Sequence, residues 1–129
     1  MVLNLVQAGR TWKSLVGPFT EAGLQVVPLD SAGLMAQEAH AMRSCLAARI
    51  AECRAGNERY FSIRDEASGA RLAVLGLKRR PDGRWTPIDL KGPSNAEVGD
   101  LLIRLLASIV VARYDRAERE AAAYEAIPA

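Results

Sequence analysis

The last third of the chain has the longest hydrophobic pattern that a single helix can explain. Ser94-Asn95-Ala96-Glu97 matches the capping-box sequence, in which the serine hydroxyl accepts from a first-turn amide and the glutamate reaches back to the cap. We therefore expect a helix from Ser94 to about Tyr124, roughly 30 residues or ~45 Å long. Its first half is apolar on nearly every face, which predicts a central core element lying across a sheet. Because a domain of this size has a radius of gyration near ~14 Å, the helix should overhang the domain or bend.

Three segments before this helix have the pattern of an antiparallel β-meander. A strand begins near Tyr60, and the turn residues 66–69 separate it from residues 70–79, whose side chains alternate with a period of two. Pro81-Asp82-Gly83 predicts a tight hairpin turn, and residues 84–90 supply the third strand. Pro87 has no N–H for a strand ladder, so this strand should be at an edge or bulged.

A second helix is predicted before the meander. Asp30 or Ser31 can cap it, and it should run to about Arg54, where Gly56 is a natural stop. We expect one stripe of this helix to face the core, made of Met35, Met42, Cys45, Arg49 and Cys53.

The N-terminal region has a weaker pattern. Residues 2–22 favour one or two short helices, and residues 24–29 favour an edge strand or an extended lead-in because they contain Pro28. The sequence therefore predicts a single α+β domain with N-terminal helices, a central helix, a three-stranded meander and a long C-terminal helix on the sheet. In this scheme 1–23 is a helical lead-in, 24–112 the core, and 113–129 the overhanging helix end and tail.

Composition limits the classes of function. The 129 residues are 50% hydrophobic and 25% charged, with 17 basic and 15 acidic residues and a net charge of +2. This balance excludes a whole-surface attraction for nucleic acid or anionic lipid. Neither an export signal nor a membrane span is predicted, so we expect a cytoplasmic protein that does not engage a membrane.

The end of the C-terminal helix is a candidate partner-binding surface. Val110, Tyr114, Ala117, Ala121 and Tyr124 are spaced four, three, four, three, as in a heptad seam, with charged residues around them. One interpretation is a helix end that packs back on its own domain or a solvated tail. The other is a docking or homodimer surface, for which the candidate residues are Arg113, Tyr114, Arg116, Arg119 and Tyr124.

A basic hairpin is the second candidate. Lys78, Arg79, Arg80 and Arg84 surround the predicted hairpin turn beside Trp85. Such a loop can hold phosphates and stack a base on its aromatic ring. The alternative is a solubilising hairpin tip with an inward-facing tryptophan.

The two cysteines and the single histidine do not predict a metal or cofactor site. Cys45 and Cys53 would lie about 12 Å apart on one helix, too far for a disulfide. His40 and Cys45 would point in different directions, and no ligand spacing for a helical metal site is present. We expect Cys45 to be a core cysteine; a cysteine-dependent enzyme built on Cys45 is the alternative.

The order of several short motifs resembles the PcfJ-like domain of conjugative plasmids and other mobile elements. The resemblance covers roughly residues 26–114 and rests on these segments: Glu38-Ala39-His40-Ala41-Met42-Arg43-Ser44-Cys45, Gly56, Tyr60-Phe61-Ser62-Ile63-Arg64, Leu72-Ala73-Val74-Leu75, Trp85 and Lys91-Gly92-Pro93-Ser94-Asn95. Three polar positions of the family pattern are lost: Ser44 replaces a histidine, Val74 a threonine and Leu90 a glutamine.

The resemblance implies a degenerate copy from a mobile element that binds instead of catalysing. The leading hypothesis is a non-enzymatic protein-binding module that occupies a surface of a larger complex of the host or the element. Inhibition of a host defence complex, as in an anti-CRISPR protein, is one concrete form. A nucleic-acid-binding accessory of conjugation that uses the basic hairpin is the alternative from another class.

Overall fold

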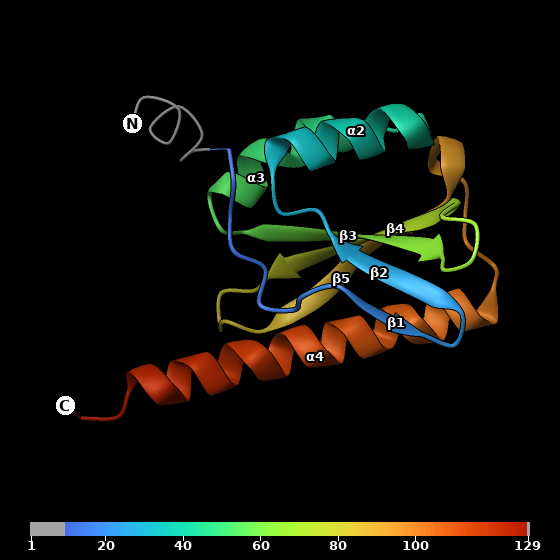
Figure 1. Ribbon diagram of the computed structural model, residues 1–129. Helices are drawn as coiled ribbons and strands as arrows, with labels where there is room; N and C mark the ends of the chain where they lie inside the picture. The colour runs from blue at the N-terminus through green and yellow to red at the C-terminus, as the bar shows by residue number, and fades with distance from the viewer. Residues whose placement is uncertain (1–9, 129) are drawn as a thin grey trace.

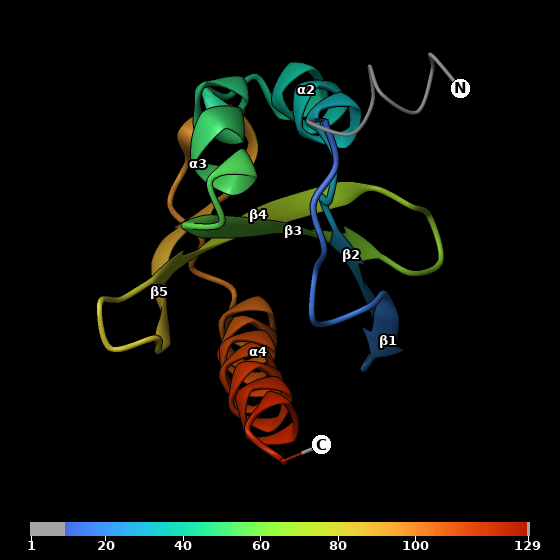
Figure 2. The same ribbon diagram turned by 90° about the vertical axis from the view of Figure 1, so that its left-hand side faces the viewer.

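The computed structural model describes residues 10–128, which form an α+β fold of three layers (Figure 1). The middle layer is an antiparallel sheet in which the five described strands follow chain order, β1 to β5. One face of the sheet is covered by short helices and the other by one long helix, α4 (Figure 2). The elements are β1 Phe19–Glu21, β2 Leu24–Pro28, α2 Ala32–Met42, η1 Leu46–Arg49, α3 Ile50–Arg54, β3 Glu58–Asp65, β4 Arg71–Arg79, β5 Trp85–Lys91, η2 Pro93–Asn95 and α4 Leu101–Glu125.

The predicted meander is present as β3, β4 and β5. Gly69 and Gly83 adopt the left-handed backbone that their turns require, with φ of 75° and 87°. Strand β5 forms one edge of the sheet, and its pairing with β4 shifts register between Gly76 and Leu77. The expectation that Pro87 marks an edge or bulged strand is confirmed.

The N-terminal helices that we expected are absent from residues 10–22, while residues 2–9 of that expectation lie outside the described residues. Instead, β1 and β2 form a hairpin in which Phe19 pairs with Val26. Ala22 and Gly23 both have positive φ, which matches the right-handed twist of a two-residue hairpin turn. Strand β2 is therefore an inner strand, and Pro28 is tolerated because it is the last residue of that strand.

The single helix expected up to Arg54 is broken into α2, η1 and α3. Ser31 caps α2 as predicted, accepting a hydrogen bond from the Leu34 amide at 3.0 Å. Arg43 then adopts a left-handed conformation, with φ of 52°, and ends α2. Because the chain changes direction there, the predicted stripe does not persist: Met35, Met42 and Cys53 are buried, whereas Cys45 is exposed.

The cap of the long C-terminal helix lies six residues later than the capping box predicted. Ser94 and Asn95 have positive φ and belong to the short η2 turn. Glu97 does not return to a helix cap, because its carboxylate binds the Lys91 ammonium at 2.6 Å. Asp100 is the cap, and its carboxylate accepts from the Ile103 amide at 3.0 Å.

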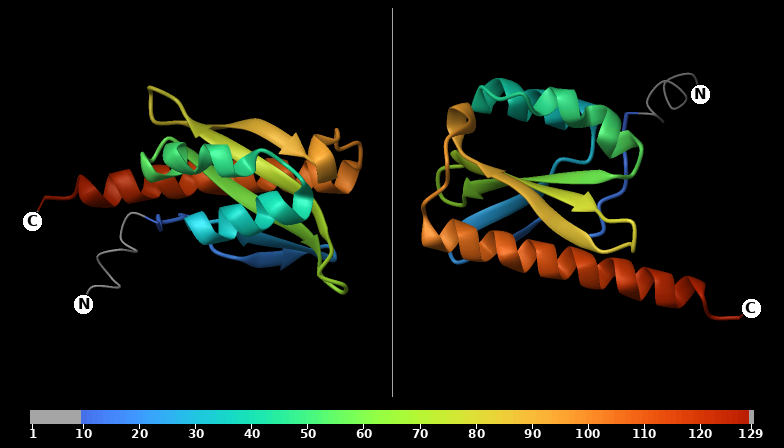
Figure 3. Two further views of the ribbon diagram at one scale, coloured as in Figure 1. Left: turned by 90° about the horizontal axis from the view of Figure 1, so that it is seen from above. Right: turned by 180° about the vertical axis from the view of Figure 1, so that it is seen from behind.

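Helix α4 runs unbroken for 25 residues and crosses the sheet. Figure 3 shows its last turns extending beyond the sheet, as the predicted overhang requires. The search for membrane-crossing helices, made over the described residues, finds none with the necessary length and apolar character.

Candidate docking surface

The inward side of α4 closes the larger core. Ile103, Leu106, Ala107, Val110 and Tyr114 are buried against the sheet. The Tyr114 ring makes edge contacts with Phe61 and Trp85, at centroid distances of 5.9 and 4.8 Å. Its hydroxyl accepts a hydrogen bond from the Leu15 amide at 3.3 Å. The prediction of Tyr114 as a partner-binding residue is therefore wrong, because only 1% of it is exposed.

The outward side of α4 carries large apolar side chains in its first three turns. The exposed fractions are 67% for Leu101, 46% for Leu102, 53% for Leu105 and 37% for Ile109. We call these four residues, with the exposed Ala112, the apolar face of α4. The expectation of a helix buried on nearly every face is thus correct for one side of α4 only. Clustered exposure of this kind is typical of a protein-interaction surface.

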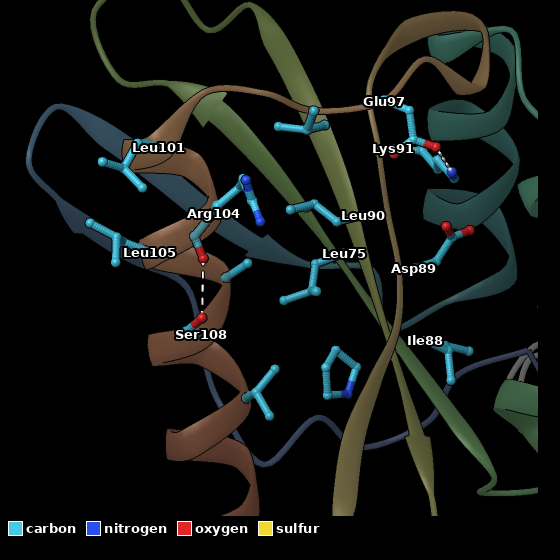
Figure 4. A pocket seen from close by; sticks show the side chains of 14 residues that line it. Leu75, Ile88, Asp89, Leu90, Lys91, Glu97, Leu101, Arg104, Leu105 and Ser108 are labelled. Atoms are coloured by element: carbon cyan, nitrogen blue, oxygen red, sulfur yellow. Dashed lines mark hydrogen bonds and ion pairs between the residues drawn. The ribbon is translucent and has the colours of Figure 1, made fainter.

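A groove of about 850 Å³ lies beside this face, between α4 and β5 (Figure 4). Its floor includes Leu75 and Leu90, and Leu105 lies on its helical rim. The Arg104 side chain extends from α4 toward the groove (Figure 4). The groove therefore combines an apolar floor with a cation and is continuous with the apolar face of α4.

The outer edge of β5 is protected against the addition of another strand. The Trp85 amide donates to the Asp115 carboxylate of α4 at 3.2 Å. Pro87 has no N–H to offer, and Lys91 is paired with Glu97 in an isolated antiparallel bridge. Natural sheets use such blocked or proline-containing edges to prevent edge-to-edge pairing. An occupant of the groove is therefore expected to present side chains, as a helix does.

The basic hairpin between β4 and β5 adjoins the second half of α4. Arg79 forms an ion pair with Glu118 at 3.1 Å, and Arg80 donates to the Thr86 hydroxyl at 2.8 Å. Trp85 is only 5% exposed, so the expectation that it stacks a base is wrong. The exposed basic side chains of the hairpin are Lys78, Arg79, Arg80 and Arg84.

The other predicted partner-binding residues differ in their availability. The Arg113 guanidinium lies 4.3 Å from the centre of the Phe19 ring and 3.9 Å from the Glu21 carboxylate, so it is committed to β1. Arg116 is exposed, and Arg119 is exposed beside Asp115. Tyr124 is 78% exposed. Sequence reasoning missed the apolar face of α4, although the all-round apolar pattern of residues 98–112 was its signal.

A smaller cavity of about 270 Å³ lies on the opposite side of β5. Cys45 lines it and is exposed, so the expectation of a core cysteine at this position is wrong. His40 does not line this cavity. A search of the described residues finds no cluster of three His, Cys, Asp or Glu side chains able to hold a metal ion.

An ion pair stabilises the wall of this cavity. The Arg49 guanidinium makes two hydrogen bonds to the Glu58 carboxylate, which also accepts from the Tyr60 hydroxyl at 2.7 Å. Burial alone would raise the pKa of Glu58, but the bonds from Arg49 and Tyr60 outweigh it and hold that pKa below its ordinary value. Burial and the bond to Glu58 raise the pKa of Tyr60. Glu58 is therefore an ionised structural carboxylate, and Tyr60 remains protonated.

Motif positions that are distant in the sequence meet at this cavity. Its lining includes Ser44, Cys45, Tyr60, Val74, Lys91, Gly92 and Asn95, all of which belong to the segments that carry the PcfJ-like resemblance. Three further motif residues form a buried network, in which Ser62 donates to Glu38 at 2.6 Å and Arg64 binds both. This convergence depends on the fold and was not visible in the sequence.

Comparison with known proteins gives no relative. The scan against family models finds no match to this chain, and the searches of curated proteins and of solved structures give no significant match.

Proposed function

We propose that this chain is a non-enzymatic protein-binding module and that the apolar face of α4 is its docking surface. The observation that supports this most directly is the exposure of Leu101, Leu102 and Leu105, between 46% and 67%. These three leucines hold a large apolar area in contact with water. A partner that covers them would remove this area from water, which is energetically favourable. Exposed patches of this kind on an otherwise closed fold are typical of binding surfaces.

The charged surroundings of the apolar face also suit a protein partner. Arg104 lies in the adjoining groove, and Arg116 and Arg119 are exposed one to two turns beyond Ala112. An apolar centre with arginines at its margin is the usual composition of an interface. The edge of β5 is blocked, which favours docking through side chains over strand addition.

The proposed setting is a mobile element, with the module acting in the cytoplasm on a larger complex. The resemblance to PcfJ-like domains supports this, together with the meeting of several of its motif positions at one cavity. Ser44 and Val74 line that cavity where the family pattern has a histidine and a threonine. The loss of these polar groups favours binding over chemistry, and inhibition of a host defence complex is one form that this binding could take.

The test compares two glutamate substitutions on the same helix. Leu105→Glu places a charge in the apolar face, and Ala122→Glu places the same charge on an exposed position about four and a half turns further along. Tagged protein is incubated in a lysate to which an untagged copy of this chain has been added, and the captured proteins are identified. We expect Leu105→Glu to lose its partners and Ala122→Glu to keep them.

Both variants should keep the melting temperature of the starting protein within a few degrees, because both positions are exposed. Equal capture by the starting protein and by Leu105→Glu would show that the apolar face is not the docking surface.

A further inference from the structure

We infer that the partner of the apolar face of α4 is the same face of a second copy, packed antiparallel to it around a twofold axis. This inference rests on the proposed function, since it names the occupant of that docking surface.

The apolar face is accessible to a second copy of the fold. Figure 2 looks along α4: the middle of the sheet, α2 and α3 lie on one side of it, while β1 and the β4–β5 hairpin lie beside it. The buried side chains of α4 point to that side, and the apolar face points away from it. Within residues 10–128, the bulk of the fold therefore leaves an approaching helix unobstructed.

The spacing of the apolar face fits helix pairing. Leu102, Leu105, Ile109 and Ala112 are separated by three, four and three residues, which is the heptad spacing of a helix seam. A twofold interface must be complementary to itself, and a short stripe of leucine, isoleucine and alanine meets that condition in either direction. The direction is decided by the charges that flank the stripe.

Charge favours the antiparallel arrangement. When the axis passes midway between Leu105 and Ile109, Leu105 faces the partner's Ile109 and Leu102 faces the partner's Ala112. Arg116 then lies at the level of residue 98 of the partner, before the partner's helix begins, and so does not face a second Arg116. A parallel pair would instead place Arg116 against Arg116 and Arg119 against Arg119. In an antiparallel pair the positive end of each helix dipole also lies beside the negative end of the other, which is favourable.

The contact should be weak and concentration-dependent. It centres on four large apolar side chains for each copy, a number typical of interfaces at the low end of the size range. We therefore expect a dissociation constant in the micromolar range. The basic hairpins stay accessible in this dimer, because they lie beside the second half of α4 and not on its apolar face.

Sedimentation equilibrium tests self-association. We expect the average molecular mass of the starting protein to rise from that of a monomer toward that of a dimer as its concentration increases through the micromolar range. Ala122→Glu should behave in the same way, whereas Leu105→Glu should weaken association at least about tenfold, because each dimer would bury two uncompensated carboxylates.

Disulfide cross-linking tests the direction of pairing. Leu102→Cys and Ala112→Cys are made separately in a Cys45→Ser background, so that Cys53, which is buried, is the only native thiol. Antiparallel pairing predicts a cross-link when the two variants are mixed and little when either is oxidised alone. Efficient cross-linking of each variant with itself would show a parallel pair and overturn the inference.

The outcomes separate this inference from the proposed function. If the protein remains monomeric at all concentrations while Leu105→Glu loses capture of another protein, the docking surface stands and the second copy is not its occupant. If Leu105→Glu alters neither self-association nor capture, both proposals fail.

Discussion

The two helical layers of this protein are attached to the sheet in different ways. Helix α4 is one continuous element held by apolar and aromatic contacts that centre on Val110 and Tyr114. The opposite layer consists of α2, η1 and α3. It packs on the sheet through a second apolar cluster and is linked to it by buried carboxylates as well. Glu38 of α2 is fully buried, accepts from Ser62 of β3 at 2.6 Å and pairs with Arg71 of β4 at 2.8 Å.

The additional buried polar contacts of α2, η1 and α3 are consistent with the short lengths of η1 and α3. A 25-residue helix can be held by apolar area along one stripe, because its own hydrogen bonds keep it straight. The five residues of α3 and the four of η1 are too short to be stable alone. Directional bonds such as the Arg49–Glu58 pair fix the position of these short pieces. Attachment of α4 by one stripe also leaves its other side available for binding.

The largest effect should come from removing the aromatic contact under α4. Tyr114→Ala would leave a cavity between Phe61 and Trp85, with an expected loss of about 3–5 kcal/mol in the free energy of unfolding. Tyr124→Ala, on the same helix but exposed, should change it by less than about 0.5 kcal/mol. Urea unfolding monitored by circular dichroism measures both. Equal effects of the two substitutions would mean that α4 is not held at Tyr114.

A smaller effect should come from neutralising a carboxylate under the short helices. Glu58→Gln removes the charge that Arg49 and Tyr60 bind, at a cost of about 1.5–3 kcal/mol near neutral pH. The cost is below that of Tyr114→Ala because 45% of the Arg49 side chain is exposed and can regain water.

The pH dependence of this effect has a defined sign. Because the pKa of Glu58 is lowered in the folded protein, its contribution to stability is present above the unfolded value, near 4.5, and is lost as pH falls through the folded value. The difference between the starting protein and Glu58→Gln should therefore shrink as the solution is acidified below pH 4.5. A difference that stays constant down to pH 2 would show that the Glu58 charge does not contribute.

The elements predicted correctly are those whose pattern is local. The meander was recognisable because Gly69 and Gly83 mark its turns and the strands between them alternate with a period of two. The stop after Arg54 was recognisable for the same reason, since Gly56 has a φ of 83°. The break at Arg43 was not, because an arginine in the left-handed conformation has no sequence signal and is stabilised by the surrounding fold.

The errors at the candidate sites arise from contacts between distant residues. The capping box at Ser94 was a reasonable local prediction, but Lys91 on β5 competes for Glu97, and Asp100 caps the helix instead. The spacing of Tyr114 fits a surface seam, but its ring packs against Phe61 and Trp85 of the sheet. Spacing alone identifies a stripe of α4 and does not show which stripe meets the sheet.

The smallest expected effect on stability comes from a substitution at Cys45. The two cysteines also allow rates of thiol labelling to be compared within the layer formed by α2, η1 and α3. Cys45 is exposed, whereas Cys53 is fully buried and burial raises the pKa of its thiol to about 12. A thiol reagent at pH 8 should therefore modify one cysteine of the folded protein rapidly and the second only as the layer opens. Cys45→Ser should abolish the fast phase and change the free energy of unfolding by less than about 0.5 kcal/mol.

The slow phase measures how firmly the short helices are held. Glu58→Gln should accelerate it, because Arg49 and Glu58 connect η1 to β3 next to Cys53. Leu105→Glu, on the opposite face of the sheet, is the matched control and should leave it unchanged. Equal labelling rates for Cys45 and Cys53 in the folded starting protein would show that α2, η1 and α3 do not shield Cys53 from solvent. The proposed difference between the two helical layers would then be wrong.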